Sequence, residues 1–155
     1  MSSGKCTLVP SQFFDGNCAG DYLAAVVGKD GRRADVAYRE IPEYGAFLVY
    51  GCDSQDEAPR MYEILKKLPQ LKDYNKILCA FENGVLSLGI AQGGSLLLSN
   101  EFDAPDFTTA QYYIFLCLSQ LQLNPEVSTI CFLTDLDREQ KLSLFQYFKD
   151  VEICG

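Results

Sequence analysis

Histidine is absent from this sequence of 155 residues. Ser-His-Asp and Cys-His catalysis therefore cannot be built within the chain, and neither can the usual proton shuttle near neutral pH. The chemistries that remain are carboxylate catalysis, a metal ion held by oxygen ligands, or no catalysis at all.

Basic residues are also scarce. The chain has 13 Lys and Arg against 21 Asp and Glu, which gives a net charge of -8, and the longest basic runs are the pairs Arg32-Arg33 and Lys66-Lys67. A phosphate backbone would be repelled over most of such a surface. We therefore expect no nucleic-acid partner.

Closely spaced cysteine pairs are missing as well. A disulfide framework or a zinc site favours cysteines two to four residues apart, and no histidine is present to complete a mixed zinc site. Most of the cysteines sit among apolar neighbours, so we interpret them as small buried hydrophobes in a reducing compartment and predict no metal site. Residues 1–10 lack the charged and apolar segments of a signal peptide, which also predicts a cytoplasmic location. The seven cysteines are Cys6, Cys18, Cys52, Cys79, Cys117, Cys131 and Cys154.

The second half of the chain predicts a three-stranded meander. Residues 76–81 form a nearly continuous apolar run, which is typical of a central strand buried on both faces. Asn83-Gly84 supplies the positive φ angles of a tight hairpin before a second strand at residues 85–91. Gly93-Gly94 turns the chain again into a third strand at residues 96–102.

A helical period follows the meander. Apolar residues recur at spacings of three and four from Phe107 to Leu121, after Asp106 as a candidate cap, and Asn124-Pro125 ends the pattern. The run is shorter than the roughly 20 residues of a membrane span and contains polar side chains, so we expect a packed core helix and no membrane span.

The remaining residues predict a strand at 128–134, a second helix at 135–148 and a last strand at 151–154. We expect Leu142, Phe145 and Phe148 to form the apolar stripe of that helix. The order strand, strand, strand, helix, strand, helix, strand describes a mixed α/β sheet of the ribonuclease-H-like type.

The first half predicts α and β elements but no meander of its own. We expect the end of a strand at residues 7–10, an interrupted helix at 11–27, and strands at 36–41 and 46–52. A capping box at residues 54–57 starts a further helix that ends at Pro69. The polar stretch 70–75 is the best boundary, so we predict two domains, residues 1–75 and 76–155. The helix that ends at Pro69 has an apolar stripe that consists of Met61, Ile64, Leu65 and Leu68.

Several phrases carry a family resemblance. They are CTLVPSQFF at residues 6–14, EIPE at 40–43 leading into FLVY at 47–50, and the segment from 112 to 126 that ends in LQLNPE. Together with the order of elements they resemble an uncharacterised bacterial family, domain of unknown function 3822, with an actin-like ATPase fold. The resemblance implies two ribonuclease-H-like lobes, of which the first is partial here because the chain starts near the end of its first strand. A second copy could then complete an exposed sheet edge.

The resemblance also indicates where a nucleotide would bind. Working actin-like ATPases place an acidic residue and glycines in the first hairpin of each lobe, which corresponds here to Glu82, Asn83 and Gly84. The adenosine-binding turn would follow the fourth strand of the lobe, at Asp135. These four residues are the candidate ligands for ATP or Mg²⁺, yet the hairpin has no glycine pair and no Ser or Thr, and no GxxxxGK[ST] or GxGxxG pattern occurs in the chain. The glycine turns are fully explained as hairpins that need positive φ angles.

A third reading uses the acidic residues alone. Glu82, Asp135 and Asp137 would meet at one edge of the sheet if the strands before them are parallel neighbours, and their oxygens could hold Mg²⁺ as in ribonuclease-H-like nucleases. Such nucleases carry an acid within the first strand, where this chain has Leu-Cys-Ala at residues 78–80. Asp135 is equally suited to cap the following helix.

We therefore expect a non-catalytic, cytoplasmic interaction or scaffold protein with degenerate nucleotide-binding motifs and no cofactor. A protein partner or self-association is expected, and some of the abundant aromatic residues would form the interface. The alternatives are a divergent ATP-binding protein and, in third place, an acid-metal nuclease.

Overall fold

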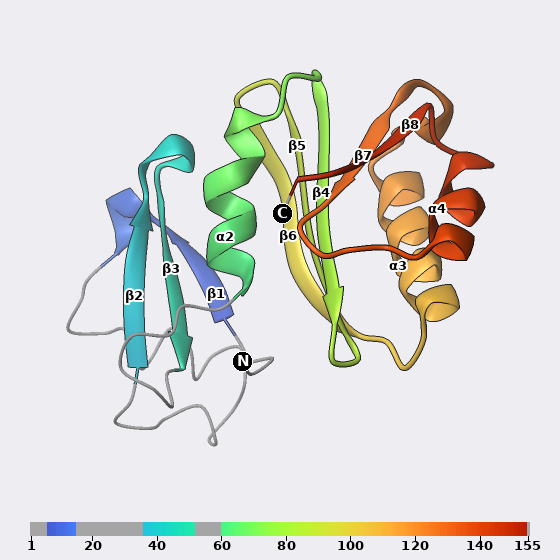
Figure 1. The fold of residues 1–155 in the computed structure, drawn as a ribbon. Helices are drawn as coiled ribbons and strands as arrows, with labels where there is room; N and C mark the ends of the chain where they lie inside the picture. The colour runs from blue at the N-terminus through green and yellow to red at the C-terminus, as the bar shows by residue number, and fades with distance from the viewer. Residues whose placement is uncertain (1–5, 15–35, 52–59, 155) are drawn as a thin grey trace. The chain divides into compact units, whose positions relative to one another are not determined.

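A computed structural model describes residues 6–14, 36–51 and 60–154 (Figure 1). The described chain belongs to two compact units, Met1–Glu63 and Ile64–Gly155. The expected helix beyond residue 14 and the capping box at residues 54–57 lie outside the described residues. The domain division after residue 75 stays a prediction.

The first unit contains a three-stranded antiparallel sheet in the order β1-β3-β2. Its strands are β1 (Cys6–Pro10), β2 (Val36–Ile41) and β3 (Ala46–Gly51), close to the expected spans. Gly45, with φ +59°, ends the short 3-10 turn between β2 and β3. Ser11–Phe13 is a single 3-10 turn at the position where a helix was expected to begin.

The second unit contains a five-stranded mixed sheet in the order β6-β5-β4-β7-β8. The antiparallel strands are β4 (Asn75–Glu82), β5 (Val85–Gln92) and β6 (Ser95–Asp103). The shorter strands β7 (Thr129–Phe132) and β8 (Asp150–Ile153) extend the sheet beyond β4 in parallel. The order of strands and helices confirms the expected mixed α/β fold.

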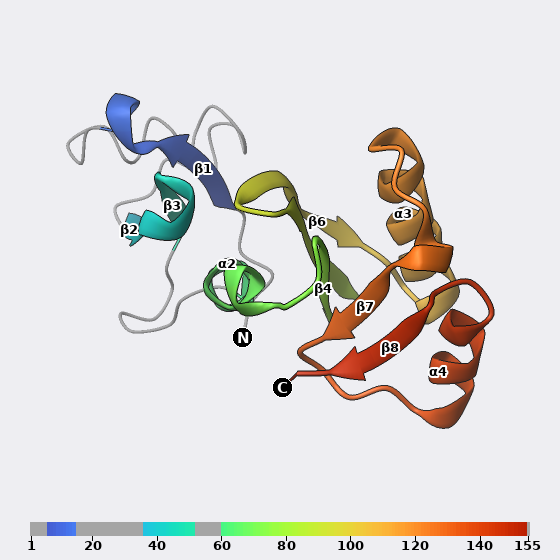
Figure 2. The ribbon, with the colours of Figure 1, turned by 90° about the horizontal axis from the view of Figure 1, so that it is seen from above.

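Successive side chains along the central strands point to opposite faces of this sheet. Ile77 and Cys79 of β4 join Leu88 of β5 in the main core, which α3 (Phe107–Gln120) and α4 (Arg138–Phe145) cover (Figure 2). On the opposite face of β5, Gly89 lies against Ile64 of α2 (Arg60–Lys67). All four members of the expected α2 stripe are buried: Met61, Ile64, Leu65 and Leu68.

Helix α3 matches its sequence pattern. Asp106 is the N-cap and accepts a hydrogen bond from the Thr109 N–H at 2.8 Å, while Ala110, Ile114 and Leu118 are buried. Among the described helices, none has both the length and the apolar character that crossing a membrane requires.

Helix α4 differs from its prediction. Asp137, and not Asp135, is its N-cap, because Asp137 and Gln140 form a reciprocal capping box. The expected stripe is wrong at Leu142 and Phe145, which are 53% and 46% exposed. Leu144 is buried instead, and Phe148 is buried beyond the end of the helix.

Candidate functional sites

The hairpin between β4 and β5 is a tight two-residue turn. Asn83 and Gly84 have φ angles of +53° and +73°, both in the left-handed region. The Gly84 carbonyl accepts a hydrogen bond from the Ala104 N–H at 2.9 Å. The turn thus needs its Asn-Gly pair for backbone geometry, independently of any ligand.

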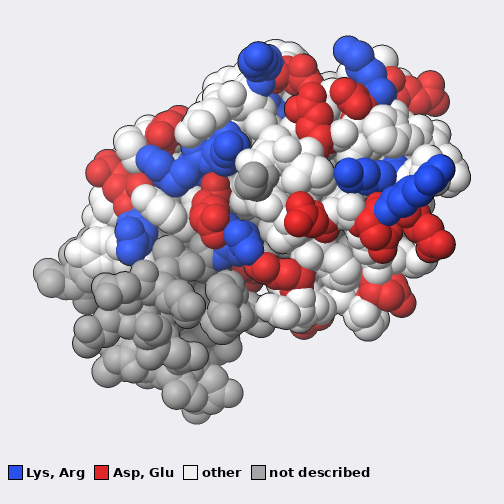
Figure 3. All heavy atoms as spheres, in the orientation of Figure 1, with Lys and Arg blue, Asp and Glu red and all other residues white. Residues whose placement is uncertain are grey.

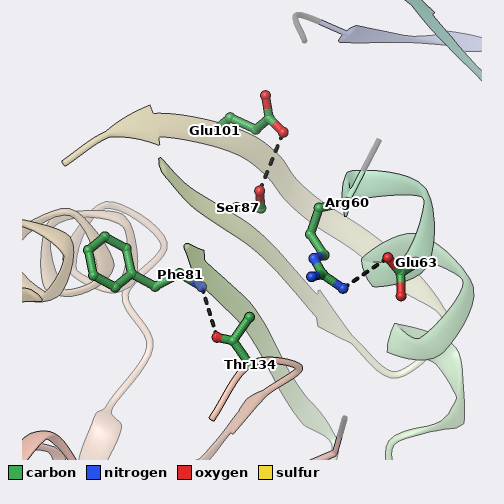
Figure 4. A network of polar contacts seen from close by, with 6 residues as sticks. All are labelled: Arg60, Glu63, Phe81, Ser87, Glu101 and Thr134. Atoms are coloured by element: carbon green, nitrogen blue, oxygen red, sulfur yellow. Dashed lines mark hydrogen bonds and ion pairs between the residues drawn. The ribbon is translucent and has the colours of Figure 1, made fainter. Parts of the chain in front are cut away.

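The ends of β4 and β7 meet at one edge of the sheet, as expected for parallel neighbours. The Phe81 N–H donates to the Thr134 hydroxyl at 3.1 Å (Figure 4), and the Leu133 N–H donates to the Cys79 carbonyl at 2.8 Å. Glu82 and Asp135 each lie one residue beyond the Phe81–Thr134 bond, with Glu82 half-buried and Asp135 exposed.

The carboxylates at this edge do not form a compact ligand set. A carboxylate oxygen of Asp137 caps α4 by accepting from the Gln140 N–H at 2.8 Å. Within the described residues, Glu82, Asp135 and Asp137 are not a group whose oxygens all lie within 4.8 Å of one another. Binding of nucleotide or Mg²⁺ by Glu82, Asn83, Gly84 and Asp135 stays a prediction.

Large exposed hydrophobic side chains gather on the two helices of the second unit. The described residues include ten such side chains, and five of them, 39–62% exposed, lie on α3, on α4 or directly after α4. We call these five residues the α3–α4 surface: Tyr112, Leu116, Leu142, Phe145 and Tyr147.

Contacts between α3, α4 and the turn after α4 hold the two helices together. The rings of Phe115 and Tyr147 meet edge to face, with centroids 5.0 Å apart. The Ser143 hydroxyl donates to the Gln111 side-chain oxygen at 3.0 Å. Four of the five exposed side chains are therefore carried by a packed helix pair, and Tyr147 follows directly after α4.

One cluster of potential metal ligands was not expected from the sequence. Cys131, Glu152 and Cys154 place one ligand atom each within 4.8 Å of one another, although Cys131 lies more than twenty residues before the other two. Burial first, and then the nearby Cys154, Glu152 and Asp73, raise the pKa of the Cys131 thiol. The available signal was the two-residue alternation of the last strand, which puts Glu152 and Cys154 on one face.

Comparisons with known proteins agree with this architecture. The family model "Protein of unknown function (DUF3822)" matches residues 55–151, which is more than half of the chain. A search of the curated proteins found no match.

A solved structure also resembles this chain. It is the crystal structure of a protein from Bacteroides thetaiotaomicron VPI-5482 with an actin-like ATPase fold and unknown function. The TM-score is 0.73 at 19% sequence identity, and the match covers 98% of this chain but 65% of that one. At this identity the likeness shows the fold alone, so the expected actin-like ATPase fold is confirmed. The chain belongs to the DUF3822 family of proteins of unknown function.

Proposed function

We propose that this protein is an interaction protein that pairs with a second copy of itself through the α3–α4 surface and does not hydrolyse nucleotide. The observation that supports the proposal is the concentration of exposed apolar side chains on α3 and α4. Isolated exposed hydrophobes are normal on a protein surface, whereas a cluster on one helix pair is typical of an interaction site.

The chemistry of the α3–α4 surface suits a symmetric pair. Aromatic side chains bury large areas at little entropic cost, and Tyr112 and Tyr147 keep a hydroxyl for the polar rim. Arg138, Glu139 and Lys141 are exposed on α4 and supply both signs of charge beside the apolar residues. A two-fold axis brings the same patch against itself, so a surface with an apolar centre and both charge signs can be self-complementary.

Non-catalytic behaviour is supported by the hairpin. Gly84 has a positive φ angle and its carbonyl accepts from Ala104, which accounts for the glycine without a phosphate. The alternative function is divergent ATP binding at Glu82, Asn83, Gly84 and Asp135.

Location and partner class are part of the proposal. Cys79, Cys117, Cys131 and Cys154 carry free thiols, which suits a cytoplasmic protein in a reducing compartment. Basic and acidic side chains are intermixed on the face drawn in Figure 3, and the net charge is -8, which supports a partner other than nucleic acid.

Light scattering coupled to size exclusion tests self-association. From micromolar to submillimolar protein, the wild-type mass should rise from one chain to two. Because two chains of net charge -8 repel each other, added salt should strengthen the pair. Leu142→Glu should stay monomeric, while Leu97→Glu, an exposed hydrophobe on β6, should behave as wild type.

Two results would contradict the proposed pairing. One is a monomer at every concentration and salt. The other is loss of association in Leu97→Glu but not in Leu142→Glu, which would place the contact at the β6 edge of the sheet instead.

Thermal denaturation with ATP and Mg²⁺ tests the alternative. Our proposal predicts an unchanged midpoint. A rise of several degrees that disappears in Glu82→Ala and Asp135→Ala would establish ATP binding at the predicted residues.

A further inference from the structure

Two adjacent parallel strands bring three potential metal ligands to one face of the second-unit sheet. Cys131 of β7 and Glu152 of β8 are register partners, and the Cys131 Sγ lies 3.9 Å from a Glu152 carboxylate oxygen. Cys154 follows two residues after Glu152, so it faces the same side. The three ligand atoms lie within 4.8 Å of one another.

The backbone fixes the ligand geometry in advance. The Cys154 N–H donates to the Phe132 carbonyl at 2.7 Å, which continues the strand pairing beyond the end of β8. On the other face, Ile130 and Phe132 are packed into the main core. Cys131 is thus held between two anchored neighbours, so this ligand loses little conformational entropy on binding.

A cleft gives an ion access to these ligands. It has a volume of about 260 Å³, and Cys131 and Glu152 line it together with Asp73, Lys72 and Asn75. Glu152 is exposed, Cys154 is half-buried and Cys131 is buried. The Asp73 carboxylate adds negative charge near Cys131, which favours a cation there.

We propose that Cys131, Cys154 and Glu152 bind a divalent cation of the zinc type. Two thiolates and one carboxylate are a ligand set for Zn²⁺, and tetrahedral bond lengths require sulfur and oxygen ligands roughly 3.6 Å apart. The Cys131–Glu152 separation of 3.9 Å needs only a small contraction. A fourth coordination position would be left for water or another small exogenous ligand, as in zinc sites with three protein ligands.

Binding displaces the thiol protons, since thiolates and not thiols coordinate the metal. The site is independent of the α3–α4 surface and of the hairpin residues. It therefore adds a binding activity beyond the proposed self-association.

Cobalt titration of the full chain, reduced with a thiol-free phosphine, tests the site. Co²⁺ should give one equivalent of thiolate-to-metal charge-transfer absorption with tetrahedral d–d bands, and Zn²⁺ should abolish both. Cys154→Ser should lose the bands, and because Cys154 is half-buried its replacement leaves the core intact. Glu152→Gln should shift the titration midpoint to higher cobalt concentration. Cys117→Ala, at a core-facing position of α3, is the matched control and should titrate as wild type.

A second readout is the thermal midpoint, which Zn²⁺ should raise in the wild type and in Cys117→Ala but not in Cys154→Ser. The proposal is overturned if the wild type shows no thiolate bands at saturating cobalt. It is also overturned if Cys154→Ser and Glu152→Gln titrate as wild type, since the metal would then bind elsewhere in the chain.

Discussion

Alanine at position 89 should destabilise the second unit by overpacking. Gly89 sits in the middle of β5 and faces Ile64 and Leu68. A Cβ atom placed there would lie 2.7 Å from the Ile64 Cγ2 and 3.3 Å from the Leu68 Cδ2. The first distance is too short for any real contact, and Ile64 is fully buried, so the helix must shift away from the strand.

The expected loss of stability in Gly89→Ala follows from two opposing effects. Overpacking of a buried methyl costs about 1–3 kcal/mol. Removing a glycine lowers the entropy of the unfolded chain and offsets about 0.4–1 kcal/mol of that cost. A net loss of about 1–2 kcal/mol should lower the midpoint by roughly 2–8 °C for a chain of this size.

Thermal and urea denaturation followed by circular dichroism would measure this loss. Gly94→Ala is the control, because a Cβ there meets nothing within 4 Å, and it should change stability by no more than about 0.5 kcal/mol. Ile64→Ala alone should cost about 2–5 kcal/mol, and in that background Gly89→Ala should be neutral or stabilising. An unchanged midpoint in Gly89→Ala, or an equal loss in the Ile64→Ala background, would refute the steric explanation.

Three further changes test turn, cap and charge. Gly84→Val should cost about 1–2 kcal/mol in urea unfolding, because the residue sits at φ +73°; a smaller effect than Gly94→Val would contradict this. Asp137→Ala should cost about 1 kcal/mol through loss of the capping box, with Asp137→Ser largely restoring stability. The hydrogen bond from the Thr109 N–H lowers the pKa of Asp106, so its stabilisation is present above the unfolded-state pKa and is lost as the pH falls through the folded-state pKa. An NMR titration should find this carboxyl more acidic than an ordinary Asp, and an ordinary or raised pKa would contradict the cap.

The second unit could be predicted from the sequence because its signals are local. The apolar run at residues 76–81, the Asn83-Gly84 turn and the period of α3 each depend on neighbours within a few positions. The observed strands differ from the expected spans by two residues or fewer at each end.

The stripe of α4 could not be predicted in the same way. Asp135 and Asp137 are both good capping residues, and only the reciprocal bonds with Gln140 select the second. The face that α4 turns to the core is set by its packing on the sheet, which buries Leu144 and leaves Leu142 and Phe145 exposed. Two of the five residues of the α3–α4 surface were thus expected in the core.

The cysteine cluster depends on information that the sequence does not contain locally. Spacing rules detect ligands on one loop, whereas Cys131 and Cys154 meet only because β7 and β8 pair in parallel with Cys131 opposite Glu152. A register shift of one residue would put Cys131 opposite a residue that faces the other side of the sheet. Register is set by the packing of Ile130, Phe132 and Val151 on the core side, which is a tertiary property.

The same alternation makes the two proposals separable by experiment. Ile130 and Phe132 face the core beneath α3 and α4, so Cys131 faces the side of the sheet away from the α3–α4 surface. Leu142→Glu should therefore abolish pairing and leave cobalt binding intact, and Cys154→Ser should do the reverse. If either substitution removed both properties while the circular dichroism spectrum stayed native, the metal and the interface would have to be coupled through the two-strand edge β7–β8. Strands β7 and β8 would then couple the metal site on one face of the sheet to the α3–α4 surface on the other. In that case neither site could be assigned from its own side chains alone.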